Sequence, residues 1–431
     1  MKPVDRPAVV EDIEDERKHV PLLKQLGPGL ITGAADDDPS GIATYSQAGA
    51  QFGYGLLWSL LLTTPLMIGI QIVSARIGRV TGHGVAANIR EHYPRVVLYF
   101  IVSLLLFANT INIAADLAAM GDALVLVTGG SSSLYIVFFA LVSLTLQIFV
   151  PFPRYAPMLK ALTLALLAYA GTVLIVHTPL EALGQAFIPH VSLDREYVSM
   201  VVAVLGTTIS PYLFFWQASQ EMEEQRATPG HEPLREAPEQ ARAHLRRIKV
   251  DTYVGMTYSN LIALCIMLTT AATLHQAGAV HIDTAAAAAQ ALRPLAGDFA
   301  FALFAAGIIG TGLLAVPVLA GSAAYAVAET FRWPIGLGLP LAEARGFYSI
   351  VAAATVIGVS IDFAGVDPIK ALIVAAILNG IVSVPIMAIL MLLATNRAVM
   401  GGFVAKGRLK LLGWLATAVM AAAVLGMFVL L

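Results

Sequence analysis

Three consecutive carboxylates, Asp36, Asp37 and Asp38, lie within an apolar segment that spans residues 26–57. Charged side chains at membrane depth are costly unless they face water, a cation or a protein partner. Pro39 follows them, with a glycine on either side of the group, and this combination cannot continue an unbroken helix. Many secondary transporters build a cation site at such a break. The stretch therefore predicts a cation site, since its apolar flanks argue against the alternative of an acidic turn in a soluble protein.

A second apolar segment, residues 198–222, carries a similar interruption. Pro211 lies near its middle and the polar residues 217–220 follow, as residues 45–48 follow Pro39. Prolines are common in membrane helices, so the pair alone is a weak signal. Interrupted segments in corresponding positions of two halves are nevertheless the best sequence pointer to a transporter's binding site.

The composition excludes several classes of protein. Hydrophobic residues make up 58% of the 431 and charged residues 13%, against about 45–50% and 25% in soluble domains. The single cysteine, Cys265, excludes an intrachain disulfide and a cysteine-based zinc cluster. The sequence has no phosphate loop, nucleophile elbow or dinucleotide fingerprint. We therefore expect a membrane protein that is not an enzyme, with no cofactor and no nucleic-acid partner.

Eleven apolar segments are long enough to cross a lipid bilayer, which takes about 20 residues each. They lie at residues 27–53, 55–77, 97–128, 132–152, 157–177, 198–222, 253–275, 296–328, 347–364, 368–395 and 409–431. With the N-terminus inside, all 26 lysines and arginines except Arg195, Arg293 and Lys370 fall on the inner side. Because basic loops mark the cytoplasmic side, we expect a multi-pass protein of a bacterial inner membrane, with its N-terminus in the cytoplasm and its C-terminus outside.

Four stretches resemble one known family. They are GPGLITGAADDDPSGIATYSQAGAQFGYGLLW (27–58), ARIGRVTGHGVAANIREHYP (75–94), AADLAAMGDAL (114–124) and GTTISPYLFFWQASQ (206–220). The first resembles the first span of the Nramp family of divalent metal transporters, whose mark is an Asp-Pro-Gly-Asn tetrapeptide. The others are similar to that family's loop after the second span, its third span, and its sixth span with a Met-Pro-His motif.

The resemblance covers roughly residues 26–395 and implies an all-α membrane protein with the leucine-transporter fold. That fold has two inverted five-helix repeats plus, here, an eleventh helix, with the first and sixth helices broken around the ion. The expected division is a cytoplasmic tail (1–25), a first repeat (26–177), an outer loop (178–197), a second repeat (198–395) with a cytoplasmic loop at 225–248, and a linker with the eleventh span (396–431).

The sequence departs from the family pattern at two of the metal-binding positions. Asp38 matches the metal-binding aspartate, but Gly41 stands where the family has asparagine and Ser210 where it has methionine. Thioethers favour softer transition metals, whereas carboxylate, hydroxyl, carbonyl and water suit magnesium and manganese. Losing both side chains implies a roomier, all-oxygen site, which resembles the Nramp-related magnesium transporters more than the iron and manganese branch.

The sequence also departs from the family pattern at two positions associated with proton coupling. Tyr212 stands at the position of the family's histidine, and Ala119 replaces an acid one turn after Asp116. A tyrosine does not titrate near neutral pH. The resemblance, with these changes, implies a flux that is coupled to protons weakly or not at all.

We thus expect a secondary transporter that moves magnesium or manganese, or both, by alternating access through the lipid bilayer. The candidate metal ligands are Asp38, Gly41, Ala35, Thr207, Ser210 and Asp37; the candidate permeation or proton route comprises Asp116, Asn112, Tyr212 and Asn379.

Each candidate has a plainer alternative. Asp38 could cap a half-helix starting near Ile42, and the other polar side chains could serve helix packing. Glu221, Glu223 and Glu224 are expected on a solvated face. The alternative functions are a proton-coupled manganese or iron importer and an organic-solute symporter on the same fold.

Overall fold

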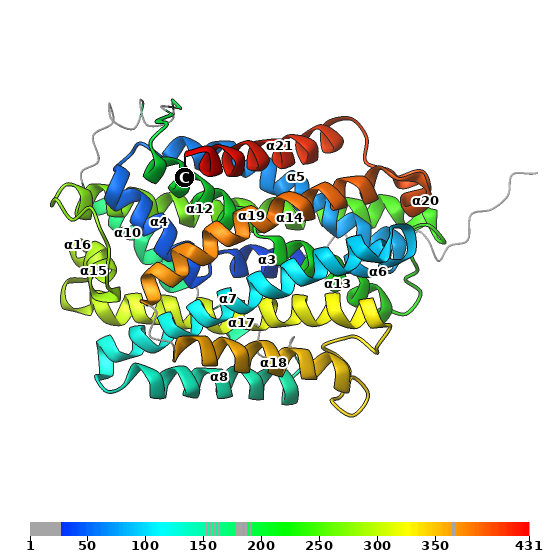
Figure 1. Cartoon of the computed structure of the whole chain (residues 1–431), viewed down its shortest axis with the longest axis horizontal. Helices are drawn as coiled ribbons and strands as arrows, with labels where there is room; N and C mark the ends of the chain where they lie inside the picture. The colour runs from blue at the N-terminus through cyan, green and yellow to red at the C-terminus, as the bar shows by residue number, and fades with distance from the viewer. Residues whose placement is uncertain are drawn as a thin grey trace, which may run out of the picture.

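The computed structural model describes residues 27–151, 164–176, 191–363 and 367–430, with isolated positions between 154 and 189. Within these residues the chain forms helices and no strand, which confirms the all-α prediction. Most helices run along the long axis of the bundle (Figure 1). The predicted tail at 1–25 lies outside the described residues, as do a few positions of the predicted fifth span (157–177) and about half of the predicted outer loop (178–197).

The helices follow the predicted spans closely. In chain order they are α3 (Pro28–Asp36), α4 (Pro39–Phe52), α5 (Leu57–Thr81), α7 (Arg95–Thr128), α8 (Ser132–Phe149), α10 (Leu167–Ile175), α12 (Arg195–Thr208), α13 (Pro211–Ala227), α14 (Ala241–Thr270), α17 (Ala300–Phe331), α18 (Arg345–Asp362), α19 (Pro368–Thr395) and α21 (Gly407–Leu430). In the described part of the chain, nine helical stretches are long and apolar enough to cross a membrane. The α3–α4 pair and the shorter α10 account for the other two predicted spans.

Both predicted helix breaks are present. Pro39 is the first residue of α4 and Pro211 the first residue of α13. Proline is tolerated there because the first N–H groups of a helix have no intrahelical partner. The half-helix α4 begins three residues before the predicted start at Ile42. The breaks leave Asp37 and Asp38 in the first gap, and Ile209 and Ser210 in the second.

The loop predicted at residues 225–248 is shorter than expected. Helix α13 continues to Ala227 and α14 already begins at Ala241, with a short 3₁₀ turn at Pro238–Gln240 before it. The basic residues of 241–250 end the apolar pattern, but alanine, leucine, arginine and lysine are good helix formers. Charge patterning therefore marked the membrane boundary and not the helix boundary.

The broken helices pack reciprocally on the two halves of the chain: α4 contacts α14, and α13 contacts α5. A glycine permits each approach. A Cβ atom at Gly49 would lie 2.4 Å from the backbone oxygen of Met267, and one at Gly78 would lie 2.1 Å from that of Ala218. Small residues let membrane helices approach this closely. This is the reciprocal pairing that two inverted repeats predict. In Figure 1, α21 lies against α5 and α19 on one side of the bundle, and α8 and α18 lie together on the opposite side.

The half-helix α3 lies against α14 with backbone almost touching backbone. A Cβ atom at Gly33 would lie 2.2 Å from the backbone oxygen of Gly255, and one at Gly255 would lie 2.2 Å from that of Gly29. Real Cβ atoms do not approach so closely, so this contact requires glycine on both helices.

We expect Gly33→Ala to lower the melting temperature of the purified protein, because α3 and α14 must separate. Overpacking of this kind costs about 1–3 kcal/mol of stability. The matched control is Gly426→Ala on α21, where the nearest atom to the added Cβ is 3.9 Å away, and where alanine should be neutral or slightly stabilising. Equal melting temperatures for the two variants in a thermal-shift measurement would contradict this packing.

Candidate metal site

The Asp38 carboxylate lies at the first break with its two oxygens in different environments. Oδ1 accepts a hydrogen bond from the backbone N–H of Gly41 at 2.7 Å, so it caps α4. Oδ2 accepts from Asn112 Nδ2 at 3.1 Å and from the Tyr212 hydroxyl at 3.3 Å. Only 2% of the Asp38 side chain is exposed. Capping of α4 thus accounts for only one of the two oxygens, because the other faces α7 and α13.

Tyr212 joins the two breaks. It lies one residue after the start of α13, and its hydroxyl lies 3.0 Å from the backbone oxygen of Ala35 near the end of α3, besides its contact with Asp38. A hydroxyl has a single proton, so it can donate to only one of these oxygens at a time. Tyr212 therefore contacts residues of the first break from the second.

Two polar residues of α7 accompany Asp38. Asn112 and Asp116 are one helical turn apart and fully buried. The Asp116 carboxylate faces the backbone N–H of Ser40 at the start of α4. No group in the described ranges makes a hydrogen bond of ordinary geometry to either of its oxygens. A buried carboxylate in this state needs a proton or a nearby cation as compensation.

Asn379 lies on the face of α19 that touches both breaks. One side of that face meets the first break, where the Ser40 hydroxyl donates to the Leu372 backbone oxygen at 3.0 Å. The other side meets the second, where the Ser383 hydroxyl donates to the Ile209 backbone oxygen at 2.9 Å. Asn379 falls between these two contacts along the helix, is buried, and its Oδ1 accepts from no described group.

Asp36 and Asp37 face a different helix. The hydroxyl of Ser259 on α14 lies 2.7 Å from Asp36 Oδ2 and 3.1 Å from Asp37 Oδ1. The three aspartates therefore do not share one set of partners, and Asp37 lies apart from the Asn112–Tyr212 side of Asp38. Ser259 was not found from the sequence, since it is more than 220 residues away and carries no motif.

The space at Gly41 is already filled. A Cβ atom there would lie 3.1 Å from Thr207 Oγ1 and 3.3 Å from the backbone oxygen of Asp36. The Ser210 hydroxyl lies 2.8 Å from the backbone oxygen of Thr207, within its own turn. Replacing asparagine by glycine thus lets the two breaks approach, and it does not widen the site at this position.

Among the described residues, no group of three or more His, Cys, Asp or Glu side chains is arranged to hold a metal ion. Ligands for a cation at Asp38 would accordingly be one carboxylate with backbone carbonyl, amide, hydroxyl and water oxygens. Such hard oxygen donors suit magnesium and manganese.

The end of the bundle where α3 begins is closed by charged contacts. Asp251 on α14 accepts from the backbone N–H groups of Gly29 at 2.6 Å and Leu30 at 3.1 Å. Arg247, one turn earlier, pairs with Glu221 at 2.5 Å and also with Glu224. The solvated face expected for these glutamates is wrong for Glu221, which is fully buried, because the N-terminal extension of α14 covers it.

Asp122 is an acid on α7 for which no role was predicted. It lies in the turn after Ala119, and both line a small cavity between α4, α7, α17 and α19. The Ser132 hydroxyl donates to its Oδ1 at 2.5 Å. The third span thus carries a second acid, one turn beyond the position where the family pattern has one.

Sequence comparisons show which known proteins this chain is similar to. A family model described as natural resistance-associated macrophage protein-like (Nramp) matches residues 29–430. The divalent metal cation transporter MntH of Deinococcus radiodurans is 28% identical over 405 residues, which are 91% of this chain and 86% of that protein.

Solved structures show the same fold. A manganese transporter from Eremococcus coleocola, in complex with an aromatic bis-isothiourea compound, has a TM-score of 0.74 at 16% identity and covers 99% of this chain and 88% of its own. Mhp1, a nucleobase-cation-symport-1 family transporter in a closed conformation, has a TM-score of 0.52 at 13% identity and covers 94% and 92%. These likenesses confirm the leucine-transporter fold.

Proposed function

Because this chain belongs to the Nramp family of membrane transporters, which are not enzymes, we propose that it moves divalent metal cations through the bilayer by alternating access. The observation that carries the proposal is the buried Asp38 carboxylate at the first break, whose Oδ2 faces Tyr212 at the second break and Asn112 on α7. A mid-membrane carboxylate at a double break has a cation as its natural partner.

Asp38 and the backbone oxygen of Ala35 are the ligands that the geometry supports best, since Tyr212 already links them. Thr207 and Ser210 would contribute from the second break as it opens, and Gly41 by letting Thr207 approach. Asp37, which faces α14, would act as a nearby charge.

Along the route, Asn112, Asp116 and Asn379 surround the site from α7 and α19 with unpaired polar atoms. We assign them to the passage of the hydrated ion, with Tyr212 between the two breaks.

Magnesium, manganese or both are the proposed substrates. No thioether stands at Ser210, and oxygen ligands favour these hard ions. The name of the Eremococcus protein, a manganese transporter, favours manganese, and MntH is named as a divalent metal cation transporter. The same ligand chemistry accommodates magnesium, as in the magnesium branch that the sequence resembles.

The proposed topology places the N-terminus in the cytoplasm and the C-terminus outside, in a bacterial inner membrane, with two repeats at 26–177 and 198–395. The basic residues near the ends of α5, α13 and α17, and near the start of α14, support this orientation.

Proton-coupled import of a transition metal is the second candidate, and Asp122 favours it. Asp116 and Asp122 give α7 two acids, although Tyr212 offers no group that titrates near neutral pH. An organic-solute symporter is disfavoured, because carboxylates at the break repel a substrate carboxylate.

Proteoliposomes that enclose a metal indicator and a pH indicator separate these candidates. We expect external magnesium or manganese to enter while the interior acidifies far less than one proton per ion, and protein-free liposomes to show neither signal. Acidification in proportion to metal entry, without an imposed voltage, would establish the proton-coupled candidate instead. Absence of metal entry, with uptake of an organic cation or amino acid, would overturn metal transport.

A further inference from the structure

A cavity of about 360 Å³ lies at the end of the bundle where α5, α13 and α17 end and the short helix α6 (Val85–His92) begins. Its charged and aromatic lining residues are His83, Arg90, Arg226, Glu329, Arg332 and Trp333. None of the candidate metal-site residues lines it. The cavity is therefore a separate feature of the molecule.

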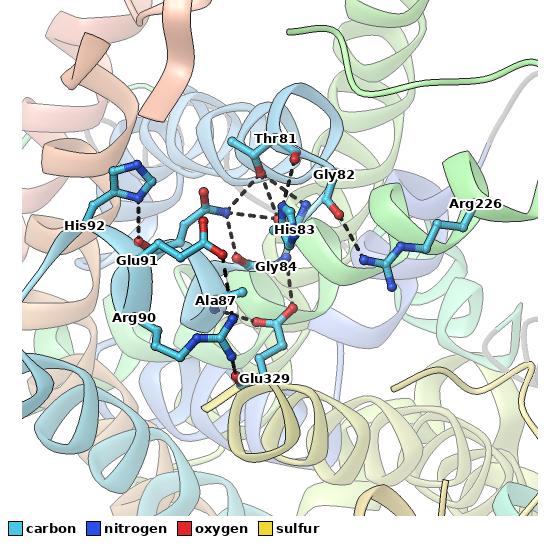
Figure 2. Close-up of polar contacts among 11 residues, drawn as sticks. Thr81, Gly82, His83, Gly84, Ala87, Arg90, Glu91, His92, Arg226 and Glu329 are labelled. Carbon is cyan, nitrogen blue, oxygen red and sulfur yellow. Dashed lines mark hydrogen bonds and ion pairs between the residues drawn. The ribbon is translucent and has the colours of Figure 1, made fainter. Parts of the chain in front are cut away.

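Glu329, the only acid in the lining, is already engaged. Its two carboxylate oxygens accept the backbone N–H groups of Gly84 at 2.9 Å and Ala87 at 3.0 Å, so it caps the N-terminus of α6. An acid at a helix N-terminus offsets the positive end of the helix dipole. Figure 2 shows these contacts beside Arg90, with Arg226 on the far side of His83. Even with Glu91, which pairs with Arg90 from outside the lining, the three arginines leave an excess of positive charge at the cavity.

The arginines have hydrogen-bonding capacity to spare. Arg90 donates to the backbone oxygen of Glu329 and lies 3.7 Å from the Glu91 carboxylate, but its Nε finds no partner among the described residues. Arg226 donates one bond, at 3.1 Å, to the backbone oxygen of Gly82. The Arg332 side chain makes no hydrogen bond or ion pair with any described residue. Guanidinium groups with free donors in a concave site are suited to phosphate oxygens.

The backbone conformation of Arg332 also indicates that a cation is favoured at this position. It caps the C-terminus of α17 with φ of 59°, and it is the only residue other than glycine with positive φ in the described ranges. Glycine is the usual residue there because it adopts this conformation without steric cost. Glycine would end the helix equally well but would remove a cation from the cavity.

Exposed aromatic residues place the cavity at a membrane surface. Phe331 and Trp333 are 54% and 39% exposed and stack with ring centroids 5.3 Å apart. Tyr99 and Phe100, near the start of the neighbouring helix α7, are 48% and 55% exposed. Aromatic side chains gather in this way at the level of the lipid headgroups.

We propose that this cavity binds the phosphate group of an anionic phospholipid. Basic pockets between membrane helices recognise such headgroups by charge and by arginine hydrogen bonds. Arg332 and Arg226 contact the phosphate from the rim, and Arg90 contacts it from the floor. The aromatic pair beside the cavity packs against the glycerol and upper acyl chains.

Native mass spectrometry of the full-length protein with phosphatidylglycerol, and separately with zwitterionic phosphatidylcholine, tests the proposal. The test variant is Arg226→Gln with Arg332→Gly, in which glycine keeps the helix cap. Its control is Arg408→Gln with Lys410→Gln at the start of α21, which removes the same charge outside the cavity. We expect the wild type and the control to retain phosphatidylglycerol in preference to phosphatidylcholine, and the test variant to bind it about fivefold more weakly for each arginine lost.

Two results would overturn the proposal. One is equal retention of phosphatidylglycerol by the test variant and the control, which would mean that the two arginines of the cavity contribute no more than basic residues outside it. The other is displacement of phosphatidylglycerol from the wild type by millimolar inorganic phosphate, which would assign the cavity to a soluble anion. A folded elution profile and an unchanged melting temperature in zwitterionic lipid ensure that the variant reports on binding.

Discussion

Asp38→Ala is expected to abolish metal uptake into proteoliposomes while the protein remains folded. The substitution removes a carboxylate that lies at the first break and contacts the second break and α7. Loss of a group that merely supports a metal ligand typically costs 10–100-fold in affinity or activity, so loss of the ligand should cost at least about 100-fold in flux. The lost cap of α4 costs about 0.5–2 kcal/mol, which a protein of this size tolerates.

Asp38→Asn separates the effect of the negative charge from that of the helix cap. The amide oxygen can still accept the Gly41 N–H and preserve the cap, but the negative charge is gone. Uptake should therefore fail in this variant too, with stability close to wild type. The control is Asp194→Asn, the same chemical change at the exposed cap of α12, where the side chain accepts from Tyr197 N–H at 3.4 Å. Uptake near wild type in both Asp38 variants would remove Asp38 from the metal site.

The double variant Gly41→Asn with Ser210→Met is expected to change selectivity. It restores the two side chains that the Nramp pattern has at these positions, and a thioether favours softer ions. Ligands that replace water disfavour magnesium, which dehydrates reluctantly. We expect the flux ratio of cadmium or manganese to magnesium to rise about tenfold, corresponding to about 1.4 kcal/mol of differential binding.

The structure adds a condition and a control to this experiment. Thr207 must give way by a few tenths of an ångström, since a Cβ at Gly41 would lie 3.1 Å from its hydroxyl. Gly41→Asn with Ser210→Leu has nearly the same volume without sulfur, so it should not gain cadmium transport. A wild type that carries cadmium strongly and magnesium negligibly would contradict the argument from ligand softness.

The helices and their breaks could be predicted from the sequence because their causes are local. A run of apolar residues spans the bilayer wherever it occurs, and proline lacks an N–H, so Pro39 and Pro211 each begin a new half-helix. The contact between Asp38 and Tyr212 was not predicted, because it depends on how closely the two breaks approach in space.

Contacts between distant segments left no local signal. Asp251 accepts hydrogen bonds from the start of α3, although it is 222 residues from Gly29. This contact depends on the close approach of α14, and so does the contact of Ser259 with Asp36. The charge of Glu221 predicted a solvent-facing side chain, but the early start of α14 buries Glu221 against Arg247.

Anomalous scattering from crystals grown with manganese tests the proposed site most directly. The expected result is one peak within about 2.0–2.6 Å of an Asp38 carboxylate oxygen, close to the backbone oxygen of Ala35, with the Tyr212 hydroxyl displaced from Asp38. The peak should vanish in Asp38→Asn crystals of the same form. A wild-type peak elsewhere, with Asp38 still bonded to Gly41, Asn112 and Tyr212, would contradict cation binding at the double break.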